Sequence, residues 1–112
     1  MGKKAKIKGK MCEVEAERAK SLSRKVLGLI LERKIYPLLF EFTHERRWSF
    51  HTFLVIKPID FLFIDKNKRV VEIKCRVRPF NFSIKPQKPV KYVLELPEGM
   101  GHLFRVGEKL KF

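Results

Sequence analysis

Three polar residues interrupt the most apolar part of the chain, and their types suit acid–base chemistry. His51 and Thr52 open an apolar run, and Asp60 follows the Pro58 turn within it. If these segments pair as antiparallel strands, His51 and Asp60 come within hydrogen-bond reach, with the imidazole as general base and the carboxylate as the group that orients it. The sequence shows no partner in an obvious nucleophile position. It therefore favours a structural alternative, in which Asp60 accepts backbone N–H bonds and His51 is a hydrogen-bonded strand residue.

A second constellation interleaves cations with aromatic rings between residues 74 and 85. Phe80 and Phe82 are two residues apart, so a strand places both rings on one face. The basic residues around them are Lys74, Arg76, Arg78 and Lys85. Rings and cations on one strand face form a stacking platform for single-stranded nucleic acid. Phe usually lies in the core, however, and the alternative is two core rings with a solvated basic rim.

The sequence shows no motif for a metal or a cofactor. His44, His51 and His102 are scattered, and there is no close pair of cysteines or histidines that could start a metal site. A glycine-rich phosphate loop is also absent. We therefore expect no metal, no cofactor and a non-enzymatic binding or accessory module. The alternative is a hydrolase-like or small-metabolite-binding domain centred on His51 and Asp60.

The charge points to a class of partner. The chain of 112 residues has 26 Lys or Arg against 12 Asp or Glu, a formal net charge of +14. Such a surface attracts nucleic acid or another polyanion. Five lysines and no acid lie in the first ten residues, which predicts a basic, flexible tail over residues 1–10. Few amides and many Lys, Glu, Arg and Ile are typical of hyperthermophile proteins, which gives the charge a second explanation as a solubilising surface.

The elements that position these residues are predicted to be short strands. The sequence predicts strands from pairs of Phe two residues apart, at 40/42, 61/63 and 80/82, and from segments in which apolar and polar residues alternate. The predicted strands cover residues 11–18, 38–42, 49–56, 59–64, 69–74, 75–84, 92–96 and 109–112. A bulge or bend is predicted at Pro79. Ser21 and the apolar residues that follow it predict one short helix. The fold class is mainly β (α+β at the margin). We expect residues 11–112 to form a single compact barrel-like or sandwich domain of seven to eight short strands with one short N-terminal helix.

Five motifs in order resemble an uncharacterised family, domain of unknown function 192, over residues 12–112. They are a helix ending in Val-Leu-Gly-Leu-Ile and the segments HTFLVIKPIDFLFIDKNKRVV (51–71), RPFNFS (78–83), YVLELPEG (92–99) and RVGEKL (105–110). Many members have a Trp-Met-Lys-Asn block where this chain has His51-Thr52-Phe53, and the stretch between Gly99 and Arg105 is short. The resemblance implies a compact β-rich pseudo-barrel and no established activity.

The sequence predicts a cytoplasmic location. No apolar run is long enough to span a bilayer, which takes roughly 20 residues, and no secretory signal is present. Cys12 and Cys75 are far apart in the chain and predict two free thiols in a reducing compartment, with a single disulfide as the alternative.

Overall fold

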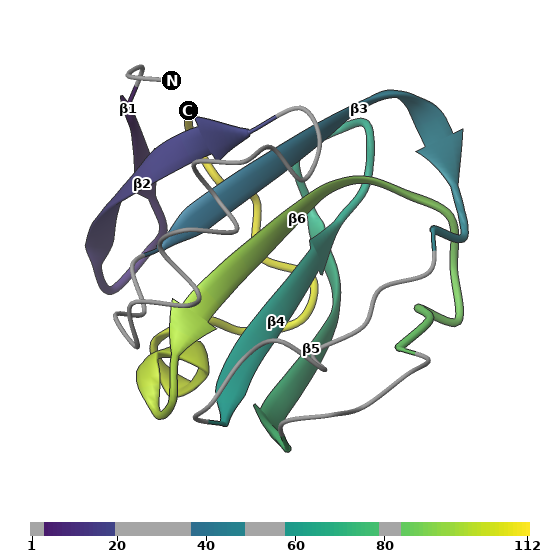
Figure 1. Cartoon of the computed structure of the whole chain (residues 1–112). Helices are drawn as coiled ribbons and strands as arrows, with labels where there is room; N and C mark the ends of the chain where they lie inside the picture. The colour runs from purple at the N-terminus through teal and green to yellow at the C-terminus, as the bar shows by residue number, and fades with distance from the viewer. Residues whose placement is uncertain (1–3, 20–36, 49–57, 79–83) are drawn as a thin grey trace.

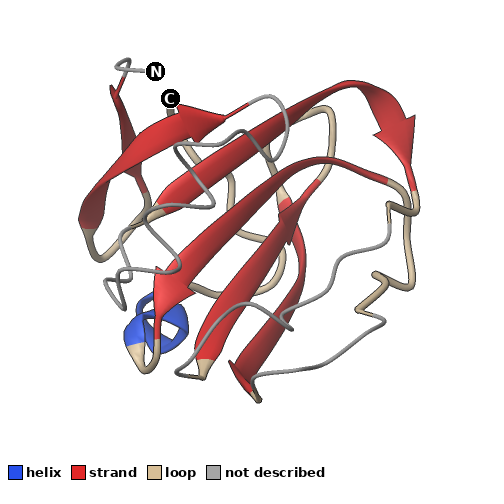
Figure 2. Ribbon diagram, viewed as in Figure 1, coloured by secondary structure: helices blue, strands red, loops and turns tan. Residues whose placement is uncertain are grey.

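Six strands in one sheet make up most of the computed structural model, which describes residues 4–19, 37–48, 58–78 and 84–112 (Figure 1). The mainly-β class is confirmed, with a single short 3-10 helix among the described elements (Figure 2). The order across the sheet is β1-β2-β3-β6-β4-β5. β2 and β3 run parallel, whereas the other neighbours pair antiparallel. The elements are β1 (Lys4–Lys8), β2 (Glu13–Ala19), β3 (Leu38–Arg46), β4 (Ile59–Ile64), β5 (Val70–Val77), β6 (Val90–Pro97) and η1 (Met100–Leu103).

The sheet buries side chains on both faces. Every residue of β4 is buried, because this strand lies between β5 and β6 and both of its faces are covered. One face holds a cluster that includes Leu62, Leu94 and Phe104. The other holds a cluster that includes Phe61, Phe63 and Val93. Because successive side chains of a strand point to opposite faces, neighbouring residues of β4 and β6 lie in different clusters.

The C-terminal segment joins the two edges of the sheet. Lys8 and Lys111 exchange backbone hydrogen bonds of 2.8 and 2.9 Å, which fasten this segment to β1. On the other side, the Leu110 N–H donates to the carbonyl of Lys68 at 2.8 Å, next to β5. Figure 1 shows the yellow segment passing behind the sheet. The sheet itself is open, and the expected barrel-like outline comes from this segment rather than from a closed ladder. Residues 109–112 make isolated bridges there and not the predicted strand.

The N-terminal segment differs from the expected tail. Residues 4–8 form β1, in which Ala5 and Ile7 are buried and the three lysines point outward. Each lysine lies directly opposite a glutamate of β2, in the pairs Lys4–Glu17, Lys6–Glu15 and Lys8–Glu13. The reason is that lysine–small-residue alternation also has the period of a strand, and β2 supplies matching alternation with the opposite charge.

Some of the other predicted elements are confirmed, and some lie outside the described residues. The strands at 38–42, 59–64, 69–74 and 92–96 are confirmed within longer or slightly shifted elements. The turn after β4 is also confirmed, because Asp65 Oδ1 accepts the N–H groups of Asn67 and Arg69 at 2.9 Å. The predicted helix after Ser21, the predicted strand over 49–56 and Pro79 lie outside the described residues.

Candidate functional site

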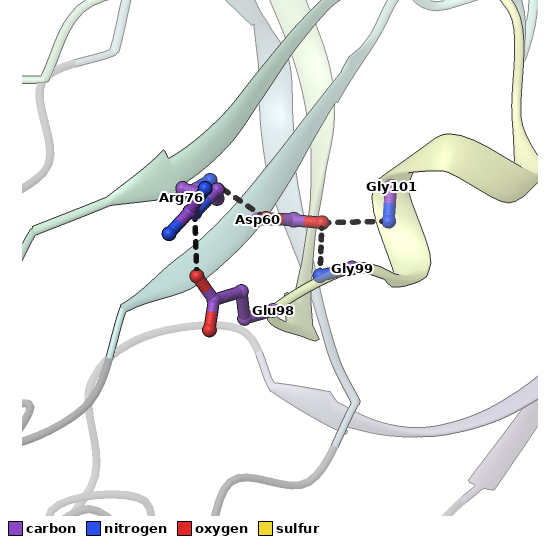
Figure 3. A network of polar contacts seen from close by, with 5 residues as sticks. All are labelled: Asp60, Arg76, Glu98, Gly99 and Gly101. Atoms are coloured by element: carbon purple, nitrogen blue, oxygen red, sulfur yellow. Dashed lines mark hydrogen bonds and ion pairs between the residues drawn. The ribbon is translucent and has the colours of Figure 1, made fainter.

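Asp60 is the centre of a buried polar network (Figure 3). The residue is fully buried, and its carboxylate accepts three backbone N–H groups. Arg76 N donates to Oδ1 at 2.8 Å, while Gly99 N and Gly101 N donate to Oδ2 at 2.9 and 2.7 Å. One side chain of β4 therefore holds the end of β5, the end of β6 and the start of η1.

The local sequence explains why the backbone converges here. Ile59 pairs with Val77 and Phe61 pairs with Lys74, so Asp60 faces two residues of β5. Two residues against one make a β-bulge, and Arg76 adopts a left-handed φ of 54° there. Gly101 is required for a different reason, because a Cβ at this position would lie 2.8 Å from Asp60 Oδ2. The bulge or bend that the sequence predicts at Pro79 lies outside the described residues, and the bulge at Arg76 was not predicted.

These contacts point to a structural role for Asp60. Both of its oxygens are committed to backbone donors, and a buried carboxylate needs such bonds to offset its desolvation. The described contacts agree with the structural alternative, in which Asp60 acts as a clamp on the backbone. The other residues of this candidate site, His51 and Thr52, lie outside the described residues.

The basic residues predicted around the Phe pair lie on or near β5, which is an edge strand of the described sheet. Arg76 is exposed and its Nε lies 2.7 Å from Glu98 Oε2. Lys74 Nζ donates to the carbonyl of Lys85 at 3.1 Å. Arg78 and Lys85 are exposed. The structure therefore brings Lys74 and Lys85 together, whereas the predicted ring positions, Phe80 and Phe82, lie outside the described residues.

Sequence reasoning missed a second carboxylate clamp at Glu108. This residue is 6% exposed, and its carboxylate accepts the N–H groups of Lys10 and, at 2.9 Å, of Arg105. Gly9 passes so close that a Cβ there would meet the Glu108 carboxylate and the Phe104 ring. The only signal in the sequence is Gly107-Glu108, which predicts a turn but no long-range partner.

Glu95 was missed as well. It lies on β6 between Leu38 of β3 and Phe61 of β4. The residue keeps some exposed surface, but burial of its carboxyl raises the pKa to about 7. Glu17 of β2 pairs with the same residue, Leu38, from the other side of β3. The Oε2 atom of Glu17 is buried without a hydrogen-bond partner in the described structure. The sequence Leu-Glu-Leu is typical of simple strand alternation, which hides this environment.

Both cysteines are free thiols. Burial raises the pKa of Cys12 and of Cys75, which disfavours the reactive thiolate form of each. Over the four described ranges, no three His, Cys, Asp or Glu side chains gather as a metal site would require. In that same part of the chain, no helix has the length and apolarity to cross a membrane.

Comparisons with known proteins place these features in a family. The model of the DUF192 family, described as "Uncharacterized ACR, COG1430", matches residues 3–112. A UPF0127 protein of Pyrococcus furiosus is 31% identical over 109 residues, covering 94% of this chain and 92% of its own. A UPF0127 protein of Pyrococcus horikoshii is 32% identical, covering 89% of each chain.

A crystal structure from Sinorhizobium meliloti supports the fold. That protein, provisionally named as a transcription regulator, aligns with a TM-score of 0.84 and 25% identity over 97% of this chain and 93% of its own.

Proposed function

Because the chain belongs to the DUF192 family, whose description names no activity, we infer its function from its own surface. We propose that it is a non-enzymatic binding module that contacts nucleic acid through Arg and Lys side chains. The cytoplasm is part of this proposal, since two free thiols suit a reducing compartment.

The observation that carries the proposal is how the described acidic side chains are used. Five of them accept backbone N–H groups: Glu45, Asp60, Asp65, Glu72 and Glu108. Glu15, Glu41 and Glu98 each pair with one cation. The carboxylates of these eight acids are thus directed to the protein's own backbone or to single cations, while many Lys and Arg side chains face solvent. A surplus of +14 on so small a surface attracts polyanions.

Two further features support the same proposal. The Sinorhizobium meliloti protein is provisionally named as a transcription regulator, an activity that involves nucleic acid. Arg76 and Arg78 are exposed at an edge strand, with Lys74 and Lys85 beside them. We include Phe80 and Phe82 in the proposed contact as predicted stacking residues. The alternative centred on His51 and Asp60 has less support, because Asp60 already accepts three backbone N–H groups.

The test is fluorescence-anisotropy binding of single-stranded RNA and DNA at several salt concentrations. The variant Arg76→Gln/Arg78→Gln should bind more weakly, with a salt slope that falls by about 0.7 for each phosphate that is no longer neutralised. The matched control is Lys4→Gln/Lys6→Gln, which removes the same two charges where glutamates face them. A melting curve of each variant accompanies the titrations. Failure of the wild type to bind either nucleic acid at low salt would overturn the proposal.

A further inference from the structure

Four cations meet along the line where the C-terminal segment joins the two edges of the sheet. Lys8 pairs with Lys111, and Arg69 pairs with Lys109, each pair in an antiparallel bridge. Residues paired in this way have side chains on one face, with their Cα atoms about 4.5–5.5 Å apart. We call these four residues the cationic seam.

The seam points outward. All four of its residues are exposed, whereas Leu110, between the two seam lysines of the C-terminal segment, is 1% exposed and lies in the core. Lys109 and Lys111 are two residues apart in an extended chain, which separates them by about 7 Å. The seam is therefore a double row of positive charge.

This arrangement costs stability. Like charges directly opposite each other destabilise a strand pair. In β1 and β2 the protein avoids that cost by placing a glutamate opposite each lysine. At the seam, Glu13 is the one facing acid in the described ladders, opposite Lys8. Glu108 is close in sequence, but its carboxylate turns inward to the N–H groups of Lys10 and Arg105.

The seam suits a repeating anion better than a small one. The N–H groups of Lys8, Leu110 and Lys111 donate to carbonyls, so these three donors are not available to a single phosphate. Phe112, an aromatic ring close by, packs edge-on against Tyr92 at 5.0 Å and is covered by Lys68 Nζ at 4.4 Å. That ring is not free to stack on a base.

We infer that the cationic seam binds the phosphodiester backbone of nucleic acid without reading its sequence. This inference rests on the proposed function and names a surface for it other than the one formed by Arg76 and Arg78 at the far end of β5. Each phosphate between two facing cations relieves their repulsion, and successive phosphates follow the double row.

The experiment compares Lys109→Gln/Lys111→Gln with the control Lys4→Gln/Lys6→Gln and with Arg76→Gln/Arg78→Gln. The probe is a fluorescein-labelled single-stranded DNA of mixed sequence, titrated at salt concentrations from about 50 to about 200 mM. If two phosphates are no longer neutralised, the salt slope falls by about 1.4, which corresponds to roughly 25-fold weaker binding at about 0.1 M salt. The control should keep nearly the wild-type slope.

Stability separates this effect from unfolding. Removing two cations from the seam relieves repulsion, so Lys109→Gln/Lys111→Gln should melt at or above the wild-type temperature. If it binds like the wild type while the arginine variant weakens, the seam inference is wrong and the proposed function stands. Equally weakened binding in the seam variant and the control would mean that binding follows net charge alone, and the seam inference again fails. If the wild type itself does not bind, both proposals fall.

Discussion

Replacing Asp60 with asparagine tests whether its carboxylate holds β5, β6 and η1 together. The side chain of asparagine has one oxygen, which can accept either from the N–H groups of Gly99 and Gly101 or from the N–H of Arg76. In either orientation the NH₂ group of the asparagine faces a buried N–H, which is left without an acceptor. A hydrogen bond to a charged group contributes about 1.5–3 kcal/mol, and an unsatisfied buried donor costs about 1–3 kcal/mol. The substitution also removes some desolvation cost, because the side chain is no longer charged. We expect the free energy of unfolding to fall by about 2–4 kcal/mol, and the melting temperature by roughly 10–15 °C.

The assay is urea unfolding at neutral pH followed by far-ultraviolet circular dichroism. Asp65→Asn is the matched control, because Asn67 and Arg69 both donate to Oδ1 alone and the amide oxygen can replace it. That variant should be destabilised by less than about 1 kcal/mol. Equal destabilisation of the two variants, or a change within about 0.5 kcal/mol for Asp60→Asn, would refute the clamp.

Two further predictions concern stability. Ile7→Ala should cost about 2–5 kcal/mol in denaturant unfolding, because Ile7 is fully buried, and a cost no larger than that of Lys6→Ala would contradict its place in the core. Glu95, with a pKa of about 7 against an ordinary 4.5, keeps its proton longer in the folded state. Stability should therefore fall as pH rises from about 4.5 to about 7, by at most about 3 kcal/mol, and Glu95→Gln should flatten this dependence in thermal melts across that pH range. Parallel pH profiles would show that Glu95 is not responsible.

Periodicity was enough to predict the strands whose two faces differ or are both buried. The Phe pairs of β3 and β4 and the Asp65 turn carry local signals, and these elements lie where the sequence predicts them. β1 was missed because its lysines suggested a solvated tail. The decisive fact was non-local, since β1 is stable only beside the matching glutamates of β2 and the core that receives Ile7.

The polar sites were harder to predict because their partners are backbone atoms. Asp60 could be singled out as a charge in an apolar segment, but its donors come from Arg76, Gly99 and Gly101, which meet only through the fold. Backbone N–H groups are present at every residue except proline and leave no mark in composition. For the same reason Glu108 resembled an ordinary turn residue.

This use of carboxylates connects the fold with the proposed function. A carboxylate that accepts backbone N–H groups stabilises a turn or bulge, and it is then oriented away from cations elsewhere on the surface. Asp60 and Glu108 are buried in this way, the first against Gly101 of η1 and the second against Lys10, just after β1. The architecture therefore uses its few acids to fix the backbone and leaves Lys109 and Lys111 facing like charges. The stability of the fold does not explain these two lysines, since an uncharged polar residue could occupy each position without repulsion.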